Sequence, residues 1–194
     1  MINVVAIQGH VFSMLQEGLS PLLTYHNLDH TLDVMNQCEA IAKAEGITDK
    51  DALLELHIAA IYHDAGFLFV YVGHEEKGCE MAREQLPGFG VNKTMVENIC
   101  EIIMATKIPQ SPKNHLQQVI CDADLDYLGR DDFFTISESL CKEVLAHKIV
   151  GSRREWEERQ ISFLKTHNYF TQSSQKKRSP GILKHLQILA EEKI

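Results

Sequence analysis

The chain has 194 residues, of which 44% are hydrophobic and 24% charged, and its formal net charge at pH 7 is -8. This length fits one domain with a sizeable core, and the composition is typical of a globular protein rather than a disordered one. The acidic balance argues against nucleic-acid binding, which needs a concentrated basic surface. A bound metal cation would still allow an acidic protein to recruit an anionic substrate.

The cysteines and the hydropathy pattern indicate a cytoplasmic protein. The five cysteines are far apart and form no C-x-x-C pair, as is typical of reduced, buried thiols. No uninterrupted apolar run approaches the ~20 residues that span a bilayer. Residues 1–5 lack the cationic start of a secretory signal. We therefore expect no membrane partner, and the sequence leaves the oligomeric state open.

Apolar positions at helical spacing, separated by glycine and proline, predict an all-α fold of about eight to nine helices. The first six predicted helices cover about 3–17, 29–44, 48–63, 74–86, 92–105 and 114–128. Two more begin at Asp131 and Ser152, and a last one follows Pro180.

Several helix starts carry capping signals. Asn92 is expected to cap the fifth helix, and Ser152 with Glu155 three residues later forms a capping box. Thr48 with Asp51 is a weaker variant of the same pattern. The run 176–178, two lysines and an arginine in a stretch rich in Ser and Gln, is expected to be a solvated loop.

Three helices each place one polar residue on their apolar face. His30, His63 and Asp122 all follow the helical spacing of neighbouring apolar residues and therefore point inward. Buried imidazoles and carboxylates are costly unless they are paired or bind a cation. A single such residue is usually a satisfied core group, but three on separate helices indicate one shared cation.

The identity of the last carboxylate stays open at this point. Asp122 lies between Val119 and Leu125 on the apolar stripe, whereas Asp124 shares a face with Ile120 and Leu128. The pattern favours Asp122.

The ordered set of motifs resembles the HD superfamily of metal-dependent phosphohydrolases. These proteins have a first His, an adjacent His-Asp pair and a distant Asp that bind one divalent ion in a helical fold. Residues 25–30 also resemble the Y-H-N-x-x-H signature of cyclic-nucleotide phosphodiesterases of this superfamily, and residues 74–78 and 121–129 resemble segments of small bacterial members. The resemblance implies a single HD domain over 1–194, with a metal-binding core at about 22–130 and a helical C-terminal extension over 131–194.

The resemblance implies one divalent metal ion (Mn, Mg, Fe, Co, Ni or Zn) held by His30, His63, Asp64 and Asp122. Mixed N/O ligands leave open positions for a water and for a phosphate oxygen. Asp64 would also orient the attacking water.

Four further residues receive roles. His26 matches the phosphodiesterase position that protonates the leaving oxygen, although a surface or capping histidine is the alternative. Lys107 could pair with a substrate phosphate, and a solvated lysine is the alternative. His74 and Glu75 would bind substrate or support the ligands, although helix capping explains Glu75 almost as well.

The function expected from these residues is hydrolysis of a phosphate ester of a small metabolite or nucleotide, phosphodiesters included. One alternative is a non-catalytic module that senses a metal or a nucleotide. The other is a helical scaffold whose histidines are incidental.

Overall fold

The computed structural model describes residues 2–191, and every regular element within this range is helical. The described chain contains nine α-helices and three short 3₁₀ helices, which confirms the all-α prediction. In chain order they are α1 (Val4–Gly18), α2 (Leu28–Ala44), α3 (Lys50–Tyr62), η1 (Ala65–Leu68), α4 (His74–Gln85), η2 (Leu86–Phe89), α5 (Lys93–Ala105), α6 (His115–Asp124), η3 (Asp126–Gly129), α7 (Phe133–Ala146), α8 (Arg153–Thr166) and α9 (Gln172–Glu191).

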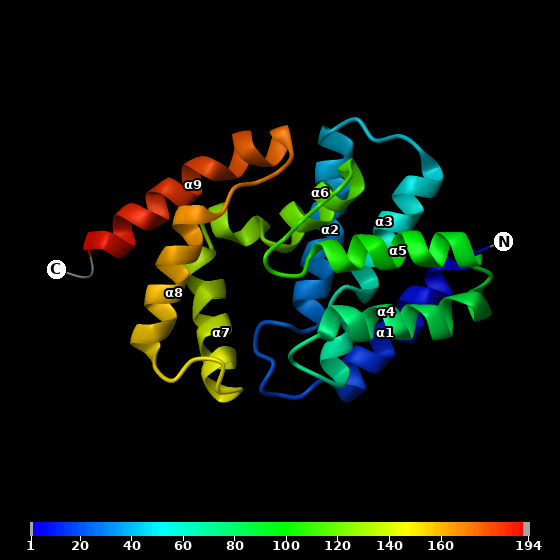
Figure 1. Ribbon diagram of the computed structural model, residues 1–194, viewed down its shortest axis with the longest axis horizontal. Coiled ribbons are helices and arrows are strands. Elements are labelled where there is room, and N and C mark those ends of the chain that lie inside the picture. The colour runs from blue at the N-terminus through cyan, green and yellow to red at the C-terminus, as the bar shows by residue number, and fades with distance from the viewer. Residues whose placement is uncertain (1, 192–194) are drawn as a thin grey trace.

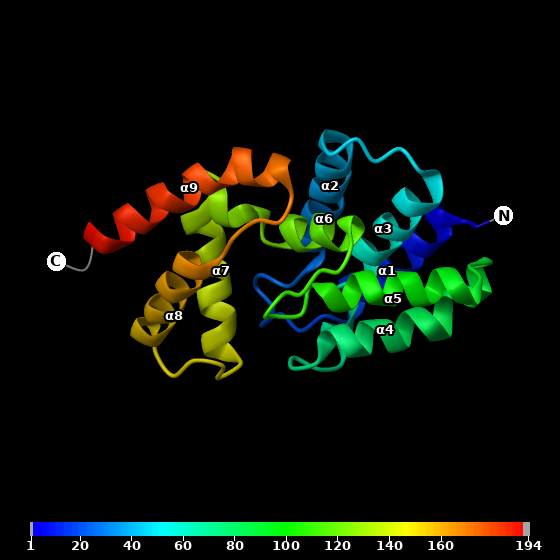
Figure 2. The ribbon, with the colours of Figure 1, turned by 45° about the horizontal axis from the view of Figure 1, so that its top comes forward.

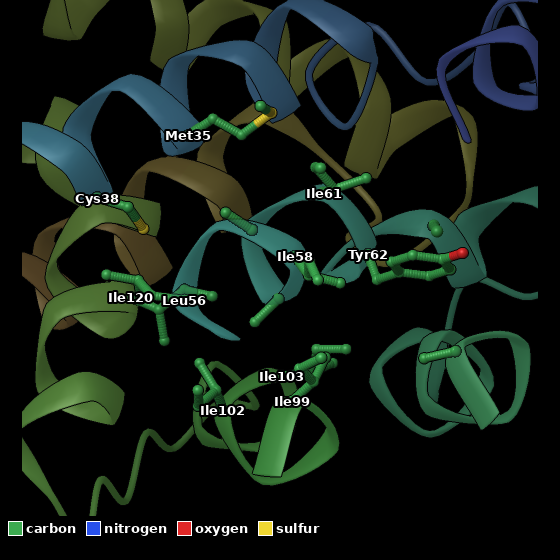
Figure 3. Packing of buried hydrophobic residues seen from close by; sticks show 14 of the residues in the cluster. Met35, Cys38, Leu56, Ile58, Ile61, Tyr62, Ile99, Ile102, Ile103 and Ile120 are labelled. Atoms are coloured by element: carbon green, nitrogen blue, oxygen red, sulfur yellow. The ribbon is translucent and has the colours of Figure 1, made fainter. Parts of the chain in front are cut away.

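Helices α1 to α6 enclose the larger of two hydrophobic cores. Buried side chains of α2, α3, α5 and α6 face one another, as Figure 3 shows for Cys38, Leu56, Ile99 and Ile120. Helices α7, α8 and α9 lie together beside α6 and the end of α2 (Figures 1 and 2). A smaller core joins them to η3 and to Tyr25. The structure therefore has a junction between α6–η3 and the last three helices.

The helix starts follow the capping signals with one exception. Asn92 and Ser152 cap α5 and α8 as predicted, each accepting a hydrogen bond from a backbone amide of the first turn. The prediction that Thr48 caps α3 was wrong. The cap is Asp49, whose carboxylate accepts a hydrogen bond from the Ala52 amide, because a carboxylate is as good an N-cap acceptor as a hydroxyl.

The helix predicted over 114–128 is broken. α6 ends at Asp124, and the chain continues as the short helix η3. The Tyr169 hydroxyl lies 3.1 Å from the Leu125 carbonyl oxygen and 3.4 Å from that of Asp126, and it donates to them. These carbonyls therefore find a partner outside the helix.

The last helix begins eight residues earlier than Pro180. α9 starts at Gln172 and runs through Pro180, so the 176–178 run is helical and not a loop. Proline removes the hydrogen bond to the carbonyl four residues before it. That carbonyl belongs to Lys176, which is exposed and can bond to water instead.

Two glycines allow close backbone contact around the His63-Asp64 turn. A Cβ on Gly66 would overlap the backbone of His74 at the start of α4. A Cβ on Gly78, in α4, would crowd the Tyr62 carbonyl at the end of α3. The turn and α4 are thus packed main chain against main chain. Among the described residues, the structure contains no helix with the length and apolar character needed to span a bilayer.

Candidate active site

Two histidines reach the same point from different helices. His30 lies in the first turn of α2, which Asn27 starts by accepting hydrogen bonds from the amides of Asp29 and His30. His63 directly follows α3 as its C-cap and is fully buried. Its Nδ1 donates to the Ala60 carbonyl at 2.8 Å. This bond turns its other nitrogen, Nε2, toward His30.

Two carboxylates complete the cluster. The Nε2 atoms of His30 and His63 are 3.4 Å apart. Asp64 Oδ2 lies 3.3 Å from His30 Nε2 and 3.2 Å from His63 Nε2. Asp124 Oδ1 lies 3.2 Å and 3.7 Å from the same two atoms. Ligand atoms of His30, His63 and Asp124 all lie within 4.8 Å of one another, so four side chains converge on one point.

The chemistry of this cluster suits a divalent cation. Asp64 Oδ2 is buried but has no hydrogen bond of acceptable geometry, and an orphaned buried carboxylate oxygen is costly without a cation. Burial alone would lower the pKa of His30, but the carboxylates of Asp124 and Asp64 raise it to about 10. The site therefore stabilises positive charge, and two imidazoles with two carboxylates form a mixed N/O ligand set.

Asp122 does not lie in this cluster, contrary to the expectation that it is the last ligand. Both of its oxygens are taken, Oδ1 by the Phe170 amide and Oδ2 by the amide and hydroxyl of Thr171, at 2.7–2.8 Å. Asp122 is buried, as its position on the apolar stripe predicts, but it faces the segment before α9. Asp124 occupies the position beside the histidines.

His26 is paired with a residue that the sequence did not point to. Its Nδ1 donates to Oε1 of Glu143, a fully buried carboxylate on α7. Glu143 Oε2 accepts the backbone amides of Tyr25 and His26 at 2.8 and 3.0 Å, and Oε1 accepts the Tyr71 hydroxyl at 3.0 Å. Burial alone would raise the pKa of Glu143. The hydrogen bonds from His26 and the two amides outweigh this effect and hold the pKa below its ordinary value. Glu143 is therefore an ionised anchor for His26.

The His74 ring lies near Asp64 and is held by an aromatic stack. His74 Nε2 lies 3.4 Å from Asp64 Oδ1 and 3.6 Å from Glu75 Oε1. The Phe67 ring lies between those of His74 and His26, with ring-centre distances of 3.9 and 4.3 Å. Burial lowers the pKa of His74, but the hydrogen bond with Asp64 raises it to about 9. No motif in the sequence marks Phe67 as part of a site.

Lys107 is not brought into the site. Its ammonium pairs with the Glu76 carboxylate, and both side chains are 46% exposed. A surface pair of this kind leaves the lysine on the protein exterior, as the solvated alternative predicts.

A cavity of about 290 Å³ opens beside the cluster. Its polar end includes His26, Asp64, His74, Glu75 and Asp124. Most of the remaining wall is apolar and comes from Leu125, η3, α7 and α8; it comprises Leu125, Tyr127, Leu128, Leu140, Trp156, Phe163 and Leu164, with Gln160 and Arg159 beside them. Tyr25, Thr106 and Ile108 complete the lining. Helix α8, with Leu140 of α7, therefore forms much of the cavity wall.

The family model of the HD domain matches residues 27–126, which is more than half of the chain. The chain belongs to the HD-domain family. This confirms the resemblance drawn from the motifs, and it supports the coarse expectation of a metal-dependent hydrolase. No curated protein matches the sequence significantly.

Two solved structures share the fold of this HD-domain protein. One is a predicted HD superfamily hydrolase from an uncultured Thermotogales bacterium, with a TM-score of 0.62 and 20% identity over 95% of this chain and 91% of the other. The other is Bacillus subtilis YpgQ in complex with ADP, with a TM-score of 0.64 and 16% identity over 97% and 95%. At this identity the likeness concerns the fold.

Proposed function

We propose that this HD-domain protein is a metal-dependent phosphohydrolase that acts on a phosphate ester or anhydride of a small metabolite, with nucleotides as the favoured class. The observation that carries the proposal is the convergence of His30, His63, Asp64 and Asp124 at the polar end of a cavity whose other end is apolar. A cation site next to an apolar chamber suits a substrate with an anionic head and an organic body.

The four clustered side chains would hold the ion, with Asp124 in place of Asp122. A divalent cation bound there supplies positive charge that lowers the pKa of a water and offsets the charge of a phosphate. Manganese, magnesium, iron, cobalt, nickel and zinc all accept such a mixed ligand set. His63 is fixed for this role by its bond to the Ala60 carbonyl, since such outer contacts hold a ligand in one tautomer.

Two residues would handle protons. Asp64 directs its second oxygen, Oδ1, toward His74, where it can accept a hydrogen bond from the attacking water and orient it. His26 commits Nδ1 to Glu143, so Nε2 is the nitrogen that would protonate the leaving oxygen. A general acid of this kind contributes about 10² to 10⁴ in rate. Glu143 acts through His26 and is therefore a positioning residue.

The cavity wall supports a nucleotide as the substrate. Three aromatic side chains, Trp156, Phe163 and Tyr127, line it. Aromatic faces suit a flat ring such as a nucleobase, because bases stack on aromatic side chains. The complex of YpgQ with ADP, in a protein of the same fold, agrees with this choice.

The test is a substrate panel run on metal-stripped protein that is then reloaded with Mn²⁺, Co²⁺, Ni²⁺ or Mg²⁺. The panel contains bis-p-nitrophenyl phosphate, p-nitrophenyl phosphate and nucleoside mono-, di- and triphosphates. Asp64→Asn should lose both bound metal and turnover. Arg83→Gln is the matched control, because Arg83 pairs with Glu97 on the surface.

Two outcomes would contradict the proposal. Turnover that persists in Asp64→Asn would remove the residue from the mechanism. Wild-type protein that binds the metal but hydrolyses nothing in the panel would favour the metal- or nucleotide-sensing module.

A further inference from the structure

The segment before and within α9 contacts the chain on both sides of Asp124. On the N-terminal side the contact is Asp122. Its Oδ1 accepts the Phe170 amide at 2.8 Å, and its Oδ2 accepts the Thr171 amide at 2.8 Å and the Thr171 hydroxyl at 2.7 Å. Asp122 is fully buried, so these bonds are the compensation for removing its carboxylate from water.

On the C-terminal side the contact is Asp126. Arg178 donates to both of its oxygens, from Nε to Oδ1 and from a terminal nitrogen to Oδ2, each at 2.8 Å. The Asp126 side chain is 2% exposed and that of Arg178 15% exposed. A two-bond pair of arginine and carboxylate in this setting fixes orientation as well as distance. The Tyr169 hydroxyl adds its contact with the Leu125 carbonyl at 3.1 Å.

The backbones of η3 and α9 also touch. A Cβ on Gly129 would overlap the backbone of Arg178, and a Cβ on Gly181 would overlap that of Gly129. The two elements thus lie at the closest approach that glycine allows. The position of α9 therefore sets the position of η3.

Asp124 is the residue most sensitive to this arrangement. It is the last residue of α6, and Leu125 after it has left the helical conformation, with φ -107° and ψ 16°. Beyond Asp124 the helix no longer supports the chain. Residues 169–181 contact the chain on both sides of Asp124. They reach Asp122 before it, and Leu125, Asp126 and Gly129 after it.

We propose that residues 169–181 act as a clamp that positions Asp124 for metal binding, with Asp122, Asp126, Thr171 and Arg178 as positioning residues. The proposal rests on the metal site assigned above. It makes the C-terminal helices part of the metal centre, although they contribute no ligand. Contacts outside the ligand set often matter in this way, and their loss typically weakens metal affinity about 10- to 100-fold.

The experiment measures Co²⁺ affinity of the full-length protein by calorimetry and records the visible absorption spectrum of the bound ion. Two variants loosen the clamp: Thr171→Val, which removes one hydroxyl, and Arg178→Gln. Thr171→Ser keeps the hydroxyl and serves as the rescue. The control is Arg153→Gln, because Arg153 makes a two-bond pair with Glu138 between α7 and α8, away from α6.

We expect Thr171→Val and Arg178→Gln to bind Co²⁺ about 10- to 100-fold more weakly, with a changed absorption band. Thr171→Ser and Arg153→Gln should behave as wild type. All titrations are run at a temperature where circular dichroism shows each variant fully folded, so that lost stability does not mimic lost affinity.

Two results would overturn the inference, and they are distinguishable. Wild-type affinity and spectrum in both clamp variants, even with a lower melting temperature, would show that the contacts only stabilise the fold. Wild-type protein that binds no Co²⁺ would remove the metal site itself, and the clamp with it.

Discussion

Glu143 holds His26 although the two residues are 117 positions apart in the chain. The carboxylate binds the His26 ring, the His26 amide and the Tyr25 amide at once. The ring is therefore fixed in both position and tautomer before any substrate enters. This pair links α7, outside the matched HD region, to the start of α2.

Glu143→Gln should lower kcat while leaving Co²⁺ affinity at the wild-type value. The glutamine side chain lacks the negative charge of Glu143. It presents to His26 Nδ1 either its NH₂ donor or its carbonyl oxygen, which is a weaker acceptor than a carboxylate. The loss of kcat in Glu143→Gln should be about 10-fold or more. It should not exceed the loss in His26→Ala, which removes the general acid and should cost ~10² to 10⁴ in rate. Steady-state kinetics of both single variants and of the double variant measure it.

The control for this pair is Glu138→Gln on the same helix, whose carboxylate pairs with Arg153 at the surface. The double variant His26→Ala with Glu143→Gln should be no slower than His26→Ala alone, because the two residues act as one unit. Additive losses would mean that Glu143 acts independently of His26.

Asp124→Asn and Asp122→Asn should behave in opposite ways in thermal unfolding. A bound ion at 100 times its Kd stabilises the folded state by about 2.7 kcal/mol. Asp124→Asn should abolish this metal-dependent rise in Tm. Asp122→Asn should lower the Tm of the metal-free protein, since it weakens three buried hydrogen bonds worth about 1 kcal/mol each, yet keep a rise at saturating metal. The reverse pattern would make Asp122 the ligand.

Trp156 provides a direct test of the substrate class. It is the only tryptophan of the chain, and it lines the cavity. Adding ADP to the metal-loaded His26→Ala variant, which should turn over about 10² to 10⁴ times more slowly, should change the Trp156 fluorescence if a base stacks nearby. In the active enzyme, Phe163→Ala should raise KM for the nucleotide about 10-fold, which equals ~1.4 kcal/mol of lost contact, with kcat little changed. Leu183→Ala, at a 64% exposed position, is the control.

The buried His167 should make the folded state less stable in acid. Burial lowers the pKa of His167 to about 4 in the folded protein, whereas an unfolded histidine titrates near 6.5. Below about pH 6.5 the unfolded chain binds the proton that the folded one does not. The contribution of His167 to stability should therefore fall as pH drops from about 6.5 toward 4. His30 and His74, whose pKa values are raised, contribute with the opposite sign. Urea unfolding of wild type and His167→Phe at pH 6.5 and 5 isolates the contribution of His167, since the wild type should lose more stability than the variant.

Local sequence rules predicted much of the fold because most helices are set by signals within one or two turns. Apolar spacing located α1 to α6, and Asn92 and Ser152 marked helix starts correctly. Pro180 was misleading. A proline normally limits a helix, but the preceding turns are held by tertiary contacts such as Arg178 with Asp126. Such contacts leave no local trace in the sequence.

In the candidate site, too, local patterns predicted some features and tertiary contacts determined the others. Spacing indicates that a residue is buried, but it does not indicate which element covers it. His30 and His63 were therefore placed inward and do meet. Asp122 was also placed inward, yet it faces Thr171. No local motif marked Glu143, because its partners come from residues 25, 26 and 71.

The two glycines around the His63-Asp64 turn have a mechanical consequence. Because Gly66 and Gly78 let the turn and α4 touch through their backbones, Asp64 and His74 belong to one stiff unit that cannot open without breaking main-chain packing. We therefore expect the cavity to widen around an incoming molecule on the side that α7 and α8 line.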